Sequence, residues 1–121
     1  MTQGSITADK IRGHKFWPDQ KDLDQIPALY ATDGVDLNDK VARLHYFTGA
    51  ADWWIFEFDL ASGDAFGWCD LGFGMGEMGY VNLNELADVA VLREGHLPRI
   101  VERDLHFTPT RFGDLNDRTG R

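Results

Sequence analysis

Basic side chains are missing from the middle of this sequence. Between Gly49 and Leu92 the chain has no Lys or Arg, although 12 such residues occur among its 121. The same segment holds eight of the 20 acids and accounts for the whole net charge of −8. These acids are Asp52, Glu57, Asp59, Asp64, Asp70, Glu77, Glu85 and Asp88. Because phosphate binding needs clustered Lys and Arg, we expect no direct binding to DNA or RNA.

Cysteine and long apolar runs are scarce as well. Cys69 is the single cysteine, which excludes an internal disulfide and is typical of a reducing cytosol. No stretch approaches the roughly 18 consecutive apolar residues that indicate a membrane span. Residues 1–5 lack the basic and apolar segments of a secretory signal. We therefore expect a cytoplasmic protein that has no contact with a membrane.

Apolar residues are plentiful enough for one packed core. They make up 43% of the chain and aromatic residues 12%, which excludes a mainly disordered protein. The length suits a single domain. We predict a flexible leader over residues 1–16, one domain over residues 17–115 and a frayed tail over residues 116–121.

Alternating apolar residues predict strands joined by short links. The predicted strands cover residues 41–47, 53–59, 65–71, 78–81 and, as a last extended piece, 101–108. The positions expected to share a face are Ala42, Leu44 and Tyr46; Trp54, Phe56 and Phe58; Ile55, Glu57 and Asp59; and Phe66 and Trp68. Short links favour antiparallel pairing.

Two segments carry helix signals. Pro18 follows Trp17 as a first helical residue would, and Pro27 ends that short helix. The spacing of Asn82 and Glu85 is that of a capping box. The apolar face after it consists of Leu83, Leu86, Ala87 and Ala90. The sequence therefore predicts an α+β fold: an antiparallel sheet of about four to five strands, one main helix packed on it and a short N-terminal helix.

Several motifs resemble those of one known family. They are Phe66-Gly67-Trp68-Cys69-Asp70-Leu71-Gly72, Gly79-Tyr80-Val81-Asn82-Leu83-Asn84-Glu85-Leu86 and Val101-Glu102-Arg103-Asp104-Leu105-His106-Phe107. Over roughly residues 20–115 the chain resembles the domain-of-unknown-function family numbered 2958. The resemblance implies a small bacterial protein of plasmids, conjugative elements or phages, encoded near antirestriction and transfer genes. It implies no catalytic residues, and residues 93–100 depart from the family pattern.

Two motifs suggest chemistry that their surroundings disfavour. The glycines from Gly74 to Gly79 spell G-x-G-x-x-G, but Tyr80 and Val81 separate them from the helix start that a dinucleotide needs. We therefore expect a flexible hairpin link and no cofactor. Cys69 with a histidine would form a nucleophilic pair, but the adjacent Asp70 opposes formation of a thiolate. We predict a buried Cys69 without a histidine contact.

Acidic residues supply the remaining candidates. Glu102, Asp104 and His106 alternate and would share a face of an extended segment, which makes them a weak candidate metal site. Ion pairing at a sheet edge with Arg103 and nearby Arg99 or Arg111 is the simpler explanation. Glu57 and Asp59 form a second carboxylate pair, but nothing in the sequence indicates the sugar cleft that glycoside cleavage requires.

The charge distribution favours a binding protein over an enzyme. We predict a non-enzymatic acidic protein of a mobile element that binds the basic surface of a protein, such as a host nucleic-acid-binding complex, as an anti-restriction or anti-CRISPR inhibitor. The expected contact residues are Asp52, Glu57, Asp59, Asp64, Asp70 and Glu77. The alternatives are a small hydrolase that uses Cys69 or the metal candidate, and an accessory subunit of a larger complex. The oligomeric state stays open.

Overall fold

The fold is α+β, as expected. The computed structural model describes residues 9–49, 51–72, 74–91 and 99–115. The strands are β1 (Val41–Ala42), β2 (Leu44–Thr48), β3 (Ala51–Phe58), β4 (Asp64–Asp70), β5 (Glu77–Asn82), β6 (Ala90–Val91), β7 (Arg99–Ile100), β8 (Glu102–Arg103) and β9 (Thr110–Arg111). The helical elements include α2 (Gln20–Leu23), α3 (Leu83–Asp88) and the 3-10 turns η1 (Leu37–Asp39) and η2 (Phe112–Asp114), and residues 9–12 are helical as well.

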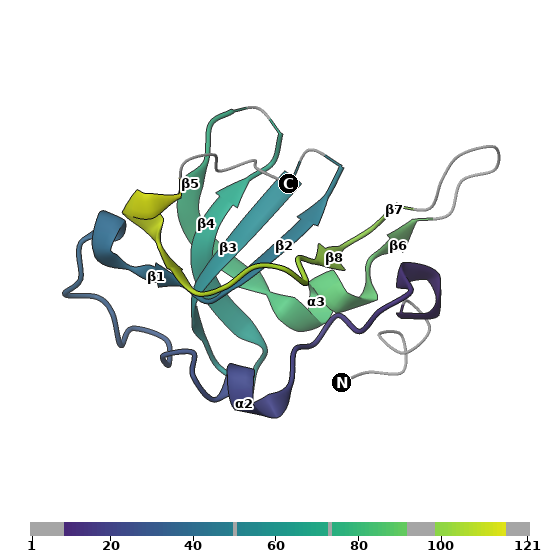
Figure 1. Cartoon of the computed structure of the whole chain (residues 1–121), viewed down its shortest axis with the longest axis horizontal. Helices are drawn as coiled ribbons and strands as arrows, with labels where there is room; N and C mark the ends of the chain where they lie inside the picture. Colours follow the sequence, from purple (N-terminus) through teal and green to yellow (C-terminus); the bar gives the residue numbers. More distant parts are fainter. Residues whose placement is uncertain (1–8, 50, 73, 92–98, 116–121) are drawn as a thin grey trace.

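A five-stranded antiparallel sheet forms the centre of the molecule and confirms the predicted antiparallel architecture. Its strand order is β5-β4-β3-β2-β8. Figure 1 shows β1 and the η2 segment on one side of this sheet, and α3 with the β6–β7 pair on the other. Strand β1 pairs with β9, and β6 pairs with β7, which gives two further two-stranded sheets beside the central one.

A β-bulge at Phe56 changes the faces that β3 presents. Ile55 pairs with Gly67, whereas Glu57 pairs with the residue just before Gly67, so Phe56 is the extra residue. Gly67 allows this close approach, because a Cβ there would lie 2.0 Å from the Trp54 carbonyl oxygen. The bulge reverses the in-and-out alternation for the rest of the strand.

The predicted grouping of side chains on β3 was therefore wrong beyond the bulge. Phe58 packs with Trp53 and Ile55, not with Trp54 and Phe56. Glu57 lies on the face opposite to Ile55, since its partner across the sheet, Phe66, packs on that other face. Strict alternation holds only in an unbroken strand.

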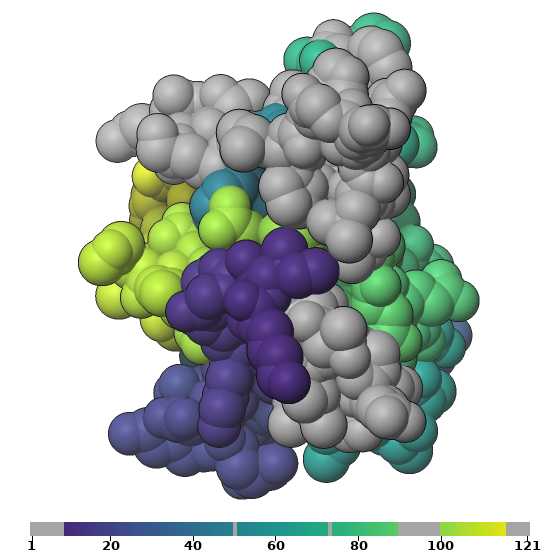
Figure 2. Space-filling model, turned by 90° about the vertical axis from the view of Figure 1, so that its right-hand side faces the viewer, coloured from purple at the N-terminus to yellow at the C-terminus, as the bar shows by residue number. Residues whose placement is uncertain are grey.

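One face of the sheet, here called the N-terminal face, is covered by the segment before β1 and by α3. Its core contains Phe16, Trp17, Ile26, Leu44, Tyr46, Trp53, Ile55, Phe58, Ala65, Leu83, Leu86, Ala87 and Val101. Phe16 is fully buried and stacks on Tyr46, with ring centroids 4.2 Å apart. Figure 2 shows the N-terminal segment, in purple, against the yellow-green segment around β8.

The other face, here called the C-terminal face, is covered by β1, β9 and the η2 segment. Its core contains Ala42, Trp54, Phe56 and Phe112, with Leu37, Phe66, Trp68, Phe107 and Leu115 packed against it. The predicted pairing of Phe66 with Trp68 on one face is confirmed. Ala42 was expected to face the same side as Leu44, but the strand breaks at Arg43 and Ala42 packs on the C-terminal face.

No main helix is present among the described residues, which corrects the second half of the predicted fold. Helix α3 has six residues, and the Asn82 side chain caps it by accepting a hydrogen bond from Glu85 N, 3.1 Å away. The helix ends at Asp88 because Ala90 enters β6. Helix α2 has only four residues. No described helix is long and apolar enough to cross a membrane.

Two further boundaries differ from expectation. Residues 9–16 belong to the packed structure, since Arg12 and Phe16 are buried, although we assigned them to a leader. The segment 101–108 is not one extended strand, because only β8 pairs and a turn follows at residues 105–106. The rest of the predicted leader and the tail from residue 116 lie outside the described residues.

Candidate functional site

The six acids predicted to contact a partner do not form one exposed surface. Asp52, Glu57 and Asp70 are buried, with exposed fractions of 0%, 1% and 6%. Asp59 is half-buried and accepts hydrogen bonds within its own turn, from Ala61 N and Ser62 Oγ. Asp64 and Glu77 are exposed. A partner can therefore reach only part of the predicted set.

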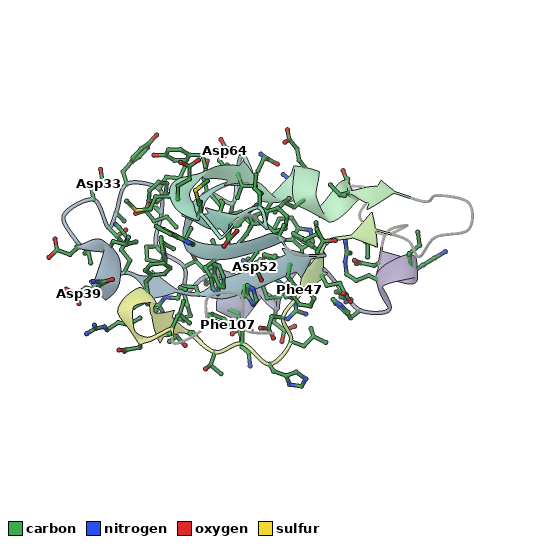
Figure 3. All side chains as sticks on the ribbon, turned by 90° about the horizontal axis from the view of Figure 1, so that it is seen from above. Asp33, Asp39, Phe47, Asp52, Asp64 and Phe107 are labelled. Carbon is green, nitrogen blue, oxygen red and sulfur yellow. The ribbon has the colours of Figure 1, made fainter. Side chains whose placement is uncertain are left out.

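Asp52 belongs to a buried chain of polar groups centred on His45. His45 Nε2 lies 2.7 Å from Asp52 Oδ1, and His45 Nδ1 lies 2.9 Å from Asp104 Oδ2. The imidazole stacks on Trp54 at 4.8 Å, nearly parallel to it. Figure 3 shows Asp52 inside the molecule, with Phe47 and Phe107 beneath it. His45 thus connects Asp104, which follows β8, to Asp52 on β3, the middle strand of the sheet.

The two ends of this chain differ in burial. Both nitrogens of His45 face carboxylate oxygens, one from Asp52 and one from Asp104. The Asp52 side chain is fully buried and that of Asp104 is 21% exposed, so the chain links the interior to the surface.

Glu57 fixes a loop instead of facing a partner. Its Oε1 accepts a hydrogen bond from Tyr30 N at 2.8 Å, and its Oε2 accepts from Thr32 N at 3.1 Å and from the Thr32 hydroxyl. Lys40, also buried, donates from Nζ to the Thr32 carbonyl and hydroxyl oxygens. Each of these buried charges therefore has polar partners, as burial requires.

This network holds Tyr30 in an unusual conformation. The φ angle of Tyr30 is +70°, in the left-handed region that non-glycine residues seldom adopt. Its side chain is 63% exposed and its ring centroid lies 6.4 Å from that of Tyr80, which is 59% exposed. Phe66 lies 4.9 Å from Tyr80, and Met78 is exposed two residues earlier in β5. We name Tyr30, Phe66, Met78 and Tyr80 the tyrosine patch.

Carboxylates surround the tyrosine patch. Desolvation of the hydroxyl raises the pKa of Tyr80, and the hydrogen-bonded Tyr30 phenol and the negative charges of Asp33 and Glu57 raise it further. Asp64 pairs with Asn82, which lies two residues beyond Tyr80 on the same strand face. Figure 3 shows Asp33 and Asp64 at the periphery of the molecule. The patch is therefore aromatic in its middle and acidic at its edges.

Cys69 has none of the surroundings of a nucleophile. It is half-buried on the N-terminal face, opposite Trp53, whereas His45 pairs with Trp54 and lies on the other face. Burial raises the pKa of the Cys69 thiol to about 11, and the Glu77 carboxylate adds to the shift. No hydrogen bond joins Cys69 to a histidine within the described ranges.

The candidate metal ligands Glu102, Asp104 and His106 do not assemble. Asp104 turns to His45, and Glu102 lies 3.7 Å from His14. His106 follows in the turn, where its backbone N–H donates to Asp104 Oδ1. In the part of the chain that the structure describes, no group of three His, Cys, Asp or Glu side chains is arranged to hold a metal ion. The expected alternation fails because the segment is not extended.

The glycine motif is explained by packing. It lies in the β4–β5 link and the start of β5, as the predicted hairpin requires. Gly76 has the Trp68 indole against it, since a Cβ there would lie 2.1 Å from Trp68 Nε1. Gly79 lies within β5 and pairs with Gly67. The motif does not open a helix, so it lacks the geometry that binds a pyrophosphate.

Sequence reasoning missed the tyrosine patch. Tyr30 lies in a loop and Tyr80 was assigned to a strand, and 50 residues separate them. An exposed aromatic residue in a loop is a weak signal of function. The stronger signal is the left-handed backbone of Tyr30, which only the structure reveals.

The comparisons with known proteins agree with the resemblance noted in the sequence. Residues 21–113 match the family described as Protein of unknown function (DUF2958). No curated protein and no solved structure matches the chain.

Proposed function

The chain belongs to the DUF2958 family, and we propose that it is a non-enzymatic protein-binding module whose tyrosine patch receives a basic segment of a partner. The observation that carries this proposal is Tyr30. A left-handed non-glycine residue costs about 1–3 kcal/mol and persists where the surroundings impose it. Here buried Glu57 imposes it, and the result is a tyrosine exposed beside a second one.

Tyrosine suits a protein interface. It provides a large rigid contact area and a polar group, and it is enriched among the residues that contribute most to binding. Met78 and Tyr80 of the patch are exposed and lie on β5, which is at one edge of the described five-stranded sheet. Met78, 44% exposed, extends the apolar surface along the same strand.

Charge selects the kind of partner. Asp33 and Asp64 border the patch, and the sequence from Gly49 to Leu92 has no Lys or Arg. Arg and Lys side chains are attracted both to these carboxylates and to the faces of tyrosine rings. Proteins that bind nucleic acid carry such side chains in quantity. The proposal therefore extends to a host nucleic-acid-binding complex, which an anti-restriction or anti-CRISPR module would inhibit by occupying its basic groove.

The first experiment measures binding of a fluorescent arginine-rich peptide by anisotropy. Tyr80→Ala should weaken binding about tenfold or more, because a central aromatic anchor is lost. Tyr30→Asn tests the second ring with a residue that tolerates the left-handed backbone. Leu60→Ala, which removes another side chain exposed to 61%, is the matched control. Equal binding by Tyr80→Ala and the wild type would exclude the patch as the binding surface.

The second experiment tests the charge. Asp33→Lys with Asp64→Lys should slow association roughly tenfold or more, and added salt should weaken wild-type binding in the same direction. These positions are exposed, so folding should be unaffected. A pull-down from a host lysate tests the kind of partner. The wild type should retain proteins that the Tyr80→Ala variant does not retain, and added duplex DNA should release those proteins. Retention of the same proteins by the wild type and by Tyr80→Ala would contradict the extension to nucleic-acid-binding partners.

A further inference from the structure

A cavity of about 310 Å³ lies between α2 and the segment that follows β8. The cavity forms where β8 stops pairing with β2. Strand β8 ends at Arg103 and the chain turns at residues 105–106, so no strand pairs with β2 alongside Leu44 on this side. Its walls include Asp22 and Gln25 from the α2 region and Phe107 and Pro109 beyond the turn. The volume is at the lower end of the range for small-molecule sites.

Two arginines line this cavity. The structure describes four arginine side chains: Arg12 and Arg111 form ion pairs with carboxylates, whereas Arg43 and Arg103 form none with a carboxylate of the described residues. This is unexpected in a chain with 20 acids and 12 bases. Arg43 Nε is buried and makes no hydrogen bond with the described residues, and Arg103 Nε donates only to the Lys15 carbonyl oxygen, at 3.3 Å.

The carboxylates in the same cavity do not neutralise these arginines. Asp104 directs Oδ2 to His45 and accepts the His106 amide with Oδ1. Asp22 is exposed and shares the lining with both arginines. Two arginines thus line one concave space, and neither forms an ion pair with a carboxylate of the described residues. Planar guanidinium groups bind carboxylate and phosphate oxygens in pairs of hydrogen bonds.

We propose that this cavity is a binding site for a small organic anion. Its carboxylate or phosphoryl group lies between Arg43 and Arg103, and its apolar part packs against Leu44, Phe107 and Pro109. The site is independent of the tyrosine patch, because it stands on different residues at the β8 edge, whereas the patch lies on β5 at the other edge of the sheet.

The test is a titration with four probes, followed by NMR of backbone amides and arginine Nε–H groups. Phenyl phosphate and benzoate carry both an anionic and an apolar part, inorganic phosphate carries only the first, and benzyl alcohol only the second. We expect saturable shifts at Arg43 and Arg103 with phenyl phosphate or benzoate, weaker binding of phosphate and none of benzyl alcohol. The tighter of the two aromatic anions identifies the anionic group.

Variants connect the binding to the two arginines. Arg43→Gln and Arg103→Gln should each raise the Kd about tenfold or more, since one charge-assisted interaction is lost. Asp22→Asn should lower the Kd, because it removes a negative charge from the wall. Arg111→Gln is the matched control, since Arg111 is ion-paired with Asp39 and Asp114 away from the cavity.

Two results would overturn the proposal. One is the absence of saturable binding of all three anions. The other is an equal loss of affinity in the Arg43→Gln, Arg103→Gln and Arg111→Gln variants, which indicates general attraction to positive charge. Circular dichroism of each variant verifies its folding. Since the two arginines and Asp22 are tested separately, the remaining variants still decide the question if one of them does not fold.

Discussion

The N-terminal face of the sheet is closed mainly by apolar side chains, with Arg12 as a buried charge, whereas the C-terminal face buries Lys40, His45, Asp52 and Glu57 among its aromatic residues. On the first face, removal of surface from water provides the stabilisation. On the second face, each buried charge must be matched by hydrogen bonds in a defined direction. The first face therefore tolerates variation in shape, and the second depends on individual atoms.

The polar groups of the C-terminal face also position the surface loops. Glu57 holds Tyr30 and Thr32, and His45 holds Asp104 at the end of β8. These two segments carry Tyr30 of the tyrosine patch and part of the wall of the cavity lined by Arg43 and Arg103. The C-terminal face thus positions part of both candidate binding sites.

The largest effect is expected on the N-terminal face. Phe16→Ala removes a fully buried ring that stacks on Tyr46, and it should lower the free energy of unfolding by about 3–5 kcal/mol. Urea denaturation measures the loss. Leu60→Ala, at an exposed position, should change stability by no more than about 0.5 kcal/mol. A loss below about 1 kcal/mol in Phe16→Ala would mean that the N-terminal segment is not part of the cooperative core.

On the C-terminal face, a change of charge without a change of shape should suffice. Asp52→Asn should lower the free energy of unfolding by about 1.5–3 kcal/mol, because Asp52 is fully buried against His45. Asp104→Asn alters the other end of the same chain, where the side chain is 21% exposed, and should cost less. Urea denaturation of both variants gives the comparison. Equal losses would show that burial does not set the strength of these contacts.

A smaller effect on stability, with a clear effect on geometry, is expected at Glu57. Glu57→Gln keeps one acceptor oxygen and loses the other, so it should cost about 1–2 kcal/mol. The Tyr30 amide signal should shift and the contact between the Tyr30 and Tyr80 rings should weaken in NMR spectra. Asp59→Asn, which changes a carboxylate bonded within its own turn, is the control. Unchanged Tyr30 signals would mean that Glu57 does not fix the loop.

The sequence predicted the elements that depend on local patterns. The strands of the central sheet and the Asn82 cap follow from alternation and from side-chain chemistry over a few residues. The length of α3 was overestimated because the apolar spacing continues through Ala90, where pairing of β6 with β7 competes with the helix. Tertiary pairing of this kind is not visible in a local pattern.

The positions of the candidate binding residues depend on contacts between distant parts of the sequence. The bulge at Phe56 moved Glu57 from the N-terminal face to the C-terminal face, and a single extra residue leaves no trace in the composition of the strand. Charge counting placed Asp52, Glu57 and Asp70 at a surface, although burial with hydrogen-bonded partners is the other way to accommodate a carboxylate. Arg43 and Arg103 come together only through the pairing of β8 with β2, 60 residues apart in sequence.

The smallest expected effect is a loss of stability at alkaline pH, caused by buried groups on the N-terminal face. Burial raises the pKa of Tyr46 above its usual range, although the charges of Arg103 and Arg12 lower it in part, and burial raises the pKa of Cys69 to about 11. Above the pKa of the unfolded thiol, the unfolded chain releases this proton before the folded chain does. Stability must then fall as pH rises.

Urea denaturation at a series of pH values from neutral to alkaline tests this prediction. The wild type should lose stability as pH rises through the range between the unfolded thiol pKa of 9.0 and the folded value of about 11. Because the thiol is only partly buried, Cys69→Ser should recover less than about 1 kcal/mol of that loss. Tyr46→Phe should reduce the loss at still higher pH, where the unfolded phenol ionises. Glu57→Gln leaves both groups in place and should retain the wild-type slope. An identical slope in Cys69→Ser and the wild type would place the origin of alkaline sensitivity elsewhere than at this thiol.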